Sequence, residues 1–501
     1  MNDTAFFFSH SNQIKWYTAF ASAFREIKKG NKVVLFVHGE VDKECAMQFD
    51  CYDEVIDIIE GFDMSYLHPI DRTTRIDNII LELEKAIGEN ILWDSLKIDR
   101  WARATENTGF VINYINHCST LIFGLIDKHR PVFGLGENTM AIYRLAYYKM
   151  KSLDIKYLSP IGTRYYERFY IEDSLDWLWE DAINLYEKFS IKLPKGECHD
   201  QAAITFDNIT KKNAKPGAFE AFKGKQSIGY VPIWKMPFIS ILKKIIYHIQ
   251  KGKKLVQENN IRSLLEESSF HKKLYRFLWN LYSHFKYSRL VLKKIPKDIN
   301  YSTYFIHYQP EYTVDSLGRF YADQEFLIVN IASGLPSDQY LIVKDHPTMV
   351  GLRPPRFYEH IKKNKNVLLV HHSINSSELI SNSTIVFTIV GTAAIEAMFL
   401  GVPAIMFGKY AFANTNLISC CTNFWDLPGL INRKMFEKLD QVVVSKHAIA
   451  LLAAKYNGSF PGKIPANADE IDTFYNDRKN YNLVKKSFRN YLIDRILQDE
   501  L

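Results

Sequence analysis

Residues 384–408 read TIVFTIVGTAAIEAMFLGVPAIMFG, a run of 25 residues with a single charge. The run is long enough to be mistaken for a transmembrane helix. Its internal pattern instead favours a buried strand at Thr384–Val390, a turn at Gly391, a short helix at Thr392–Leu400 and a second buried strand at Ala404–Phe407. A strand, a helix and a strand in this order predict part of a parallel α/β sheet.

The same alternation recurs on both sides of this unit. In the first third of the chain, strand-like runs alternate with stretches of helical spacing, and strands are expected at Ala5–Phe8, Lys32–Val37, Pro131–Gly136 and Ile155–Leu158. Three more are expected before residue 384, at Tyr304–Tyr308, Gln339–Lys344 and Asn366–His371. We therefore predict an α/β protein with two Rossmann-like, doubly wound domains whose carboxyl strand ends face a shared cleft.

These elements divide the chain into four expected parts. Residues 1–236 form an N-terminal Rossmann-like domain and residues 237–299 a basic helical insertion. Residues 300–470 form a C-terminal Rossmann-like domain, and residues 471–501 a C-terminal helix that crosses back to the N-terminal domain. The length of 501 residues suits this division, because single hydrophobic cores stop growing at about 250–300 residues.

The composition is that of an ordinary globular protein, with 47% hydrophobic and 24% charged residues. Six cysteines are too few and too irregularly spaced for a disulfide framework or a structural zinc site. Residues 1–10 lack the basic and apolar regions of a secretory signal. These features predict a cytoplasmic protein without a structural metal.

The basic charge is concentrated in residues 237–299, which contain fourteen Lys and Arg against four Asp and Glu. Apolar and aromatic residues at helical spacing are interleaved with these charges. One interpretation is an amphipathic platform for an anionic membrane surface or a lipid-linked acceptor, which would place the protein at the inner face of the cytoplasmic membrane. The other is a helical hairpin whose charged face is simply solvated. No binding motif points to nucleic acid, which is not an expected partner.

Candidate binding residues follow the predicted strand Gln339–Lys344. Lys344, His346 and Pro347 belong to the sequence KDHP at its carboxyl end, where ligands bind in open α/β sheets. Lysine and histidine can both donate hydrogen bonds to phosphate, and the proline fixes the turn that directs them. Taken alone, this short motif would favour a surface turn.

A second group of candidates opens the helix of the 384–408 unit. Gly391 and Thr392 place backbone N–H groups and the positive end of the helix dipole after a buried strand, which suits an anion. Glu396 lies in an otherwise apolar helix, where a carboxylate is costly unless it is paired or hydrogen-bonded. Two ribose hydroxyls could satisfy Glu396, and so could a structural hydrogen bond or salt bridge with a neighbouring loop.

Three stretches together resemble those of bacterial capsule and lipopolysaccharide biosynthesis transferases. They are HYQPE at 307–311, VKDHP at 343–347 and TIVGTAAIEAMFLGVPAIMFG at 388–408. These transferases are glycosyltransferases of the two-Rossmann GT-B architecture, and the resemblance covers the second domain best. The pair His346-Pro347 is also similar to a pair found in bacterial sialyltransferases.

The resemblance implies a nucleotide-sugar donor bound in the second domain. It assigns Lys344 and His346 to the phosphate or carboxylate of the donor, Gly391 and Thr392 to the phosphate, and Glu396 to the ribose. The implied donor is a CMP-activated sugar acid such as Kdo or a nonulosonate, with a UDP sugar as the alternative. The implied acceptor is a growing capsule or O-antigen glycan, either free or lipid-linked.

Two carboxylates are candidate catalytic residues. Glu137 follows the strand Pro131–Gly136 and could deprotonate an acceptor hydroxyl, or could cap the following helix. Some β-Kdo transferases are retaining and use a carboxylate nucleophile, so the resemblance makes Glu311 a candidate for that role. Glu311 could otherwise form a salt bridge in its loop. Weaker candidates for contacts with an acceptor or a sugar are His10, Arg164 and Gln309.

No cofactor or metal ion is expected. The sequence has no glycine-rich P-loop and no DxD triad, and the pair His371-His372 lacks a third ligand at a suitable spacing. A metal-independent glycosyltransferase is therefore the expected function. Two alternatives stay open, a two-Rossmann sugar-nucleotide epimerase and a non-catalytic, membrane-associated assembly component.

Overall fold

The computed structural model describes residues 3–497 except for 11–12, 63–74, 100–101, 105–106, 213–269, 413–414, 416, 438 and 467–469. Most of the expected basic insertion therefore lies outside the described residues. The described chain forms two compact units. The first contains residues up to 175 and from 459 onward, and the second contains residues 176–212 and 270–458.

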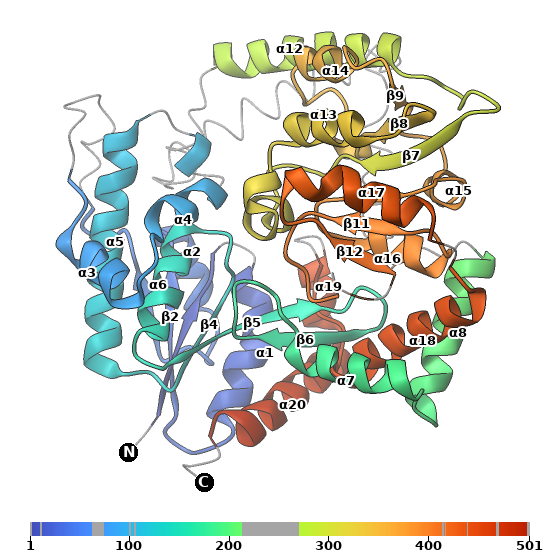
Figure 1. Ribbon diagram of the computed structural model, residues 1–501. Helices are drawn as coiled ribbons and strands as arrows, with labels where there is room; N and C mark the ends of the chain where they lie inside the picture. The colour runs from blue at the N-terminus through green and yellow to red at the C-terminus, as the bar shows by residue number, and fades with distance from the viewer. Residues whose placement is uncertain are drawn as a thin grey trace. The chain divides into compact units, whose positions relative to one another are not determined.

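The first unit is built on a seven-stranded sheet with the order β13-β6-β5-β4-β1-β2-β3 (Figure 1). Its parallel strands are β1 (Thr4–Phe8), β2 (Lys32–Val37), β3 (Glu54–Asp57), β4 (Phe133–Gly136) and β5 (Lys156–Gly162). An antiparallel edge follows, made by β6 (Arg168–Glu172) and the short β13 (Phe460–Pro461). The parallel core agrees with the prediction, and the antiparallel edge adds to it.

Helices cover both faces of this sheet. Because successive residues of a strand point to opposite faces, the central strand β1 contributes side chains to both of the resulting cores. Phe6 and Phe8 of β1 pack in one core cluster, whereas Phe7 packs in another with Phe20 and Phe488. The helices of the unit are α1 (Gln13–Arg25), α2 (Glu40–Ala46), α3 (Asn78–Ile87), α4 (Leu92–Ile98), α5 (Thr108–His129), α6 (Ala141–Lys151), α19 (Ile471–Asn476) and α20 (Arg478–Arg495).

Among the described residues, one helix is long and apolar enough to cross a membrane, by length and composition only. This helix is α5, and 56% of its most apolar window is buried inside the protein. Its side chains Phe110, Tyr114, Ile115 and Phe123 belong to the core of the first unit. Such burial is typical of the core helix of a globular domain.

The second unit contains a six-stranded, fully parallel sheet with the order β12-β11-β10-β7-β8-β9. Its strands are β7 (Asn300–Phe305), β8 (Gln339–Lys344), β9 (Val367–Val370), β10 (Val386–Thr388), β11 (Ala404–Met406) and β12 (Ile418–Cys420). Residues 384–408 thus form β10, a helix and β11, as the sequence predicts. The predicted α/β class with two Rossmann-like domains is confirmed.

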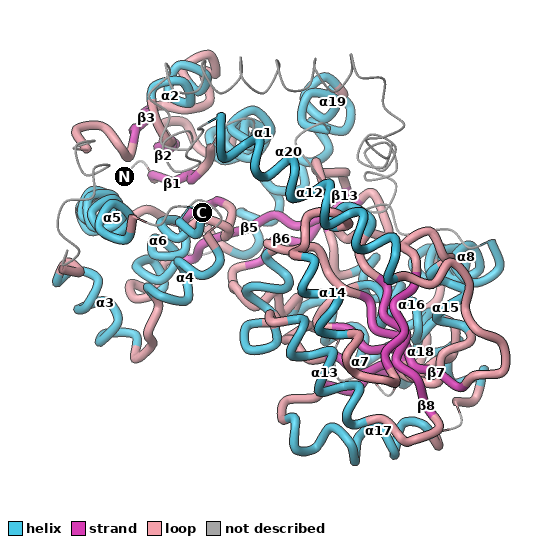
Figure 2. The backbone as a smooth tube through the Cα atoms, turned by 90° about the horizontal axis from the view of Figure 1, so that it is seen from above, coloured by secondary structure: helices cyan, strands magenta, loops and turns pink. Residues whose placement is uncertain are grey.

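Helices lie on both sides of the second sheet (Figure 2). They are α7 (Glu180–Ile191), α8 (Glu197–Lys212), α12 (Phe270–Leu290), α13 (Gln324–Gly334), α14 (Pro355–Ile361), α15 (Ser376–Ser381), α16 (Thr392–Phe399), α17 (Leu427–Met435) and α18 (Gln441–Asn457). A π-helical turn, Thr313–Leu317, and short 3-10 turns connect some of them.

The division of the chain differs from the expected boundaries at 236 and 470. Residues 176–212 belong to the second unit, because α7 and α8 pack against α18 rather than on the first sheet. The chain returns to the first unit at residue 459, where β13 pairs with β6 before α20 packs on α1.

Candidate functional site

Among the parallel strands of each sheet, the strand order reverses at one point. Open α/β sheets bind ligands outside the carboxyl ends of the strands at such a point. In the first unit, the chain builds β1, β2 and β3 outward and then places β4 on the other side of β1. In the second unit, it builds β7, β8 and β9 outward and then places β10 on the other side of β7. The residues that follow these central strands are therefore candidates for ligand contact.

His10 and Glu137 meet at the first of these points. His10 comes two residues after β1 and Glu137 directly after β4, and His10 Nδ1 lies 3.1 Å from Glu137 Oε1. Gln13, at the start of α1, donates a hydrogen bond from Nε2 to Glu137 Oε2 over 3.0 Å. Glu137 does not cap α6, whose N-cap is Met140. The structure therefore joins two separate sequence candidates into one pair.

The contacts of Glu137 favour its ionised form. Burial raises the pKa of this carboxyl, but the charge of His10 and hydrogen bonds from His10, Gln13 and Thr139 outweigh burial and lower the pKa to about 2. A carboxylate with so low a pKa is a weak base near neutral pH. It is well suited to orient His10, so that Nδ1 of His10 carries a proton and Nε2 can accept one.

A buried hydrogen-bond chain supports the backbone next to His10. Tyr143 Oη donates to the carbonyl of Ser9 over 2.8 Å and lies 3.0 Å from His38 Nδ1. The other ring nitrogen of His38 lies 2.8 Å from Tyr114 Oη. Burial and the charge of His10 hold the pKa of His38 well below its usual value, so His38 is neutral. The sequence prediction missed His38, although it directly follows the buried strand β2.

His307 occupies the switch point of the second unit. It lies two residues after β7, and its Nε2 accepts a hydrogen bond from the backbone N–H of Ile389 over 3.2 Å and lies 2.9 Å from Thr388 Oγ1. Burial, with the charges of His346 and Arg353, lowers the pKa of His307 to about 3. The ring is therefore neutral, and because Nε2 is an acceptor, its proton is on Nδ1. This residue was not among the sequence candidates.

His346 and Pro347 lie at the neighbouring strand end, after β8. His346 caps the short turn Pro347–Met349, where its Nδ1 accepts from the backbone N–H of Thr348 and lies 2.7 Å from Thr348 Oγ1. Burial lowers the pKa of His346 below its usual value. Because Nδ1 is the acceptor, the proton of the neutral ring is on Nε2. His307 and His346 are thus both neutral rings that carry one N–H donor each.

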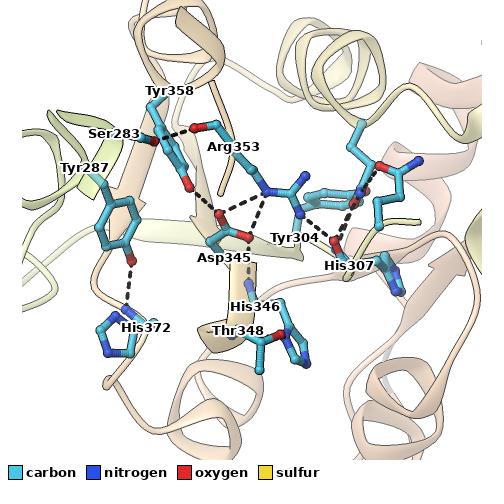
Figure 3. Close-up of polar contacts among 12 residues, drawn as sticks. Ser283, Tyr287, Tyr304, His307, Asp345, His346, Thr348, Arg353, Tyr358 and His372 are labelled. Atoms are coloured by element: carbon cyan, nitrogen blue, oxygen red, sulfur yellow. Dashed lines mark hydrogen bonds and ion pairs between the residues drawn. The ribbon is translucent and has the colours of Figure 1, made fainter. Parts of the chain in front are cut away.

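The residue between Lys344 and His346 anchors this loop (Figure 3). Asp345 is 2% exposed and accepts hydrogen bonds from Arg353 Nε, at 3.1 Å to each carboxylate oxygen, and from Tyr358 Oη at 2.6 Å. Its Oδ1 also accepts from the backbone N–H of His346 over 2.7 Å. Arg353 Nη2 donates to the carbonyl of His307. One buried ion pair therefore fixes the backbone at both histidines.

Lys344 makes internal contacts. Its ammonium donates hydrogen bonds to the carbonyl of Ile374 over 2.6 Å and to Ser376 Oγ over 2.7 Å. These contacts tie the end of β8 to the first residue of α15 and to the loop before it. They favour a structural role for Lys344 over the predicted contact with a donor phosphate, which stays a prediction.

Gln309 is also held inside the protein. Its Nε2 donates to Asp315 Oδ1 and to the carbonyl of Ala322, and its Oε1 accepts from Gln324 Nε2. Gln324 further accepts from the backbone N–H of His307 over 2.7 Å. The weak assignment of Gln309 to a sugar or acceptor is therefore not favoured, because both ends of its amide are already bonded.

Glu311 lies farther from its strand than the sequence suggested. β7 ends at Phe305, so Glu311 follows it by six residues, and not by three as the expected strand Tyr304–Tyr308 implied. The backbone N–H of Glu311 donates to Asp315 Oδ2, and its carbonyl accepts from the backbone N–H groups of Val314 and Asp315 in the π-helical turn. These contacts fix the backbone of Glu311, and its role as a nucleophile stays a prediction.

Gly391 and Thr392 open α16 directly after β10. Gly391 has φ 140° and ψ −172°, a conformation that favours glycine, and a side chain there would contact the ring of His307. The N-terminus of α16 is therefore next to the second switch point. The sequence predicts only that Gly391 and Thr392 open a helix directly after a buried strand, and their contact with a donor phosphate stays a prediction. Glu396 is half-buried on the same helix.

Arg164 is exposed in the turn that follows β5, with φ 69°. Because β5 is the parallel neighbour of β4, Arg164 and Glu137 both follow the carboxyl ends of their strands, at the same end of the sheet. Within the described residues, no group of three His, Cys, Asp or Glu side chains could hold a metal ion.

Residues 314–449 match the family described as "capsule polysaccharide biosynthesis protein". The match confirms the resemblance predicted from the sequence. It contains the candidates Lys344, His346, Gly391, Thr392 and Glu396. The residues of the first unit lie outside it, as does Glu311. A search of curated proteins gave no significant match.

Among solved structures, 133 chains match this one. The beta Kdo 2,4 transferase KpsC of Thermosulfurimonas dismutans is 13% identical over 63% of this chain and 77% of its own, with a TM-score of 0.33. A glycosyltransferase from Rickettsia africae is 10% identical over 99% and 98%, with a TM-score of 0.29. The UDP-GlcNAc 2-epimerase of Methanocaldococcus jannaschii is 12% identical over 88% and 94%, with a TM-score of 0.23. Likenesses at this level do not distinguish a transferase from an epimerase.

Proposed function

We propose that this protein is a glycosyltransferase of capsule polysaccharide biosynthesis. It would transfer a sugar from a nucleotide donor to a hydroxyl group of a growing capsule or O-antigen glycan. The family match over residues 314–449 supports the pathway. The observation that carries the transfer reaction is the pair of His10 and Glu137 at the switch point of the first sheet.

His10 is the base in this proposal, and Glu137 is its partner. His10 Nε2 takes the proton of the acceptor hydroxyl while the acceptor oxygen bonds to the anomeric carbon of the donor. The bond between that carbon and the phosphate oxygen breaks, and its electron pair leaves with the nucleotide. Glu137 stabilises the imidazolium that forms, because it is ionised and lies 3.1 Å from His10 Nδ1. This single displacement inverts the anomeric configuration.

The donor would bind at the second switch point. His307 Nδ1–H and His346 Nε2–H can donate to phosphate oxygens, and the backbone N–H groups at the start of α16 can do the same. Glu396 would accept hydrogen bonds from ribose hydroxyls. A CMP-activated sugar acid is the favoured donor and a UDP sugar the alternative. We further propose that transfer needs no metal ion and takes place in the cytoplasm, at the inner face of the membrane if the acceptor is lipid-linked.

The test is nucleotide release from CMP-, UDP- and GDP-linked sugars, measured with and without a glycan acceptor. Acceptor-dependent release that resists EDTA is the expected result. The variant His10→Gln should lose transfer by about 10²–10⁴-fold, the usual contribution of a general base, and should keep its affinity for the nucleotide. Conversion of a UDP sugar to its epimer without an acceptor would overturn the proposal in favour of an epimerase.

A matched pair of variants tests the donor site. Glu396→Gln keeps the shape of the side chain and removes its charge, so it should weaken nucleotide binding by about 1.5–3 kcal/mol while the fold stays intact. Glu378→Gln, in α15, changes a glutamate outside the proposed site and should leave binding unchanged. Unchanged affinity together with lower stability in Glu396→Gln would identify Glu396 as a structural residue.

A further inference from the structure

One side of α12 carries large apolar side chains that are exposed. We define the outward face of α12 as the four apolar residues Leu278, Trp279, Tyr282 and Phe285 together with Arg289. The four apolar side chains are each between 37% and 54% exposed. The spacing of Leu278, Tyr282, Phe285 and Arg289 puts them in one stripe along the helix, and the Trp279 ring lies 6.3 Å from that of Tyr282. Exposed aromatic side chains gathered in this way mark interaction surfaces.

The opposite side of α12 is anchored to the second unit, where α12 lies beside α14 (Figure 1). Ser283 is fully buried and donates a hydrogen bond to the carbonyl of Arg353 (Figure 3). Tyr287 Oη accepts from the backbone N–H of His372 over 3.0 Å. After the helix, Leu292 pairs with the edge strand β9. These contacts fix which side of α12 is turned outward.

The charge of α12 identifies its partner. The helix sequence FHKKLYRFLWNLYSHFKYSRL contains five Lys and Arg and no Asp or Glu. Arg289 lies on its outward face, with the guanidinium carbon 4.3 Å from the centre of the Phe285 ring. Lys286 Nζ, which pairs with Glu359, lies 5.6 Å from the Tyr282 ring. A second copy of the same face would bring like charges together, whereas an anionic partner would be attracted.

We propose that the outward face of α12 docks on an anionic lipid surface. Trp279, Tyr282 and Phe285 would enter the boundary between headgroups and acyl chains, and Arg289 would contact lipid phosphates. This is the division of labour found in amphipathic helices that lie in a membrane interface. Docking on lipid would be a second, non-catalytic role of the protein. It does not depend on the transfer reaction, because docking requires neither donor nor acceptor.

Docking would also orient the proposed donor site. Ser283 bonds to the backbone of Arg353, and the Arg353 side chain bonds to Asp345 and to the carbonyl of His307. The side chains of Arg353 and Asp345 therefore link α12 to the backbone of His307 and His346. A lipid surface held by α12 would set the orientation of that site relative to the membrane.

The experiment is flotation of the full-length protein with vesicles, without any substrate. Vesicles that contain phosphatidylglycerol should bind the protein, and vesicles of phosphatidylcholine alone should not. Binding should fall as salt rises to 0.1 M and above, where the screening length is about 10 Å or less. The variant Arg289→Gln should weaken binding about fivefold, the value of one basic residue near an anionic surface. Trp279→Ala combined with Phe285→Ala should weaken it about tenfold or more.

Matched controls use α17 and the residues that flank it. Trp425 and Phe436 are 92% and 83% exposed, so Trp425→Ala with Phe436→Ala removes a similar amount of exposed aromatic surface elsewhere on the same unit. Arg433→Gln is the corresponding charge control. All of these variants change exposed side chains and should keep the thermal midpoint of the wild type.

Three results would overturn the proposal. The first is absence of wild-type binding to phosphatidylglycerol vesicles, and the second is equal loss of binding in the α17 controls. The third is a dimer that the α12 variants dissociate, which would make a second copy the occupant of this face. Lost vesicle binding with intact transfer to a soluble acceptor would separate docking from catalysis.

Discussion

The contact between Glu137 and His10 should be visible in the stability of the protein at acid pH. The pKa of Glu137 is lowered from 4.5 to about 2, so the folded state binds this proton more weakly than the unfolded state does. The stabilisation is therefore complete above about pH 4.5 and is lost as the pH falls toward 2. The shift corresponds to about 3 kcal/mol as an upper bound.

The variant Glu137→Gln should lose this acid-dependent part of the free energy of unfolding. Urea unfolding measured at steps between neutral pH and the acid limit of the fold gives the slope for both proteins. The wild type should lose more stability than the variant over this range. Equal slopes would contradict the pairing of Glu137 with His10.

Lys344 allows a structural role to be separated from a binding role. In Lys344→Met, the carbonyl of Ile374 and the hydroxyl of Ser376 lose their donor, so we expect a loss of about 1–3 kcal/mol in unfolding free energy. Nucleotide affinity, measured by calorimetry, should change little. Lys409→Met removes an exposed lysine that pairs with Asp176 and should change stability by less than about 1 kcal/mol. Lost affinity without lost stability in Lys344→Met would restore the phosphate contact.

The sequence predicts single residues of the site better than their partners. His10 and Glu137 could be identified separately because each follows a strand-like run. Their contact depends on β1 and β4 being neighbours in the sheet, and the sequence does not show which strands are neighbours when they lie so far apart in the chain. His307 was missed because Ile306 and Tyr308 on either side of it resemble a strand, although Gln324 holds this segment as a loop.

The bounds of a strand or helix can likewise be predicted only where local sequence determines them. β8 has the predicted bounds, Gln339–Lys344, since a buried apolar run defines this strand locally. β12 has three residues and β13 two, which is too short for a periodic pattern. β13 also pairs with β6, almost 300 residues earlier in the chain, so tertiary contacts alone define it.

The start of α16 provides a prediction about an element. Gly391 combines φ 140° with ψ −172°, a region that costs other residues about 1–3 kcal/mol. A Cβ atom there would lie 3.7 Å from His307 Cε1, an ordinary contact, so backbone strain is the main effect. Gly391→Ala should therefore lower the unfolding free energy by about this amount and weaken nucleotide binding, because the N–H groups of the helix end would shift.

Gly429 is the matched control, because it lies inside α17 without a positive φ, and a Cβ atom there would lie 3.6 Å from the Arg433 side chain, an ordinary contact. Gly429→Ala should stabilise the protein slightly or leave it unchanged, since alanine favours a helix. Calorimetry with nucleotide compares the two variants. Full nucleotide affinity in Gly391→Ala would exclude the end of α16 from the donor site.

At the scale of the whole molecule, the assignment of helices to domains could not be predicted. α7 and α8 follow the first sheet in sequence but pack on α18 in the second unit. Tyr186 Oη lies 3.0 Å from His447 Nδ1, and the absence of a side chain at Gly458 allows it to pack directly on Ala182. Helical periodicity shows that α7 has an apolar face, but not which of two cores that face joins.

The two proposed mechanisms place the decisive residue in different units, and the stereochemistry of transfer would decide between them. If His10 of the first unit is the base, the acceptor attacks directly and the product has the inverted configuration. If Glu311 of the second unit is a nucleophile, a covalent glycosyl-enzyme forms first and the configuration is retained. Loss of activity in variants of either residue does not discriminate, because both could contribute.

Mass spectrometry of the protein incubated with donor alone does discriminate. We expect no sugar adduct, and we expect NMR of the product to show inversion relative to the donor, because direct attack with His10 as the proposed base forms no covalent intermediate. Glu311→Gln is the control and should behave like the wild type in the adduct experiment. A sugar attached to a peptide that contains Glu311, absent in Glu311→Gln and accompanied by retention, would replace direct displacement with a double displacement through Glu311.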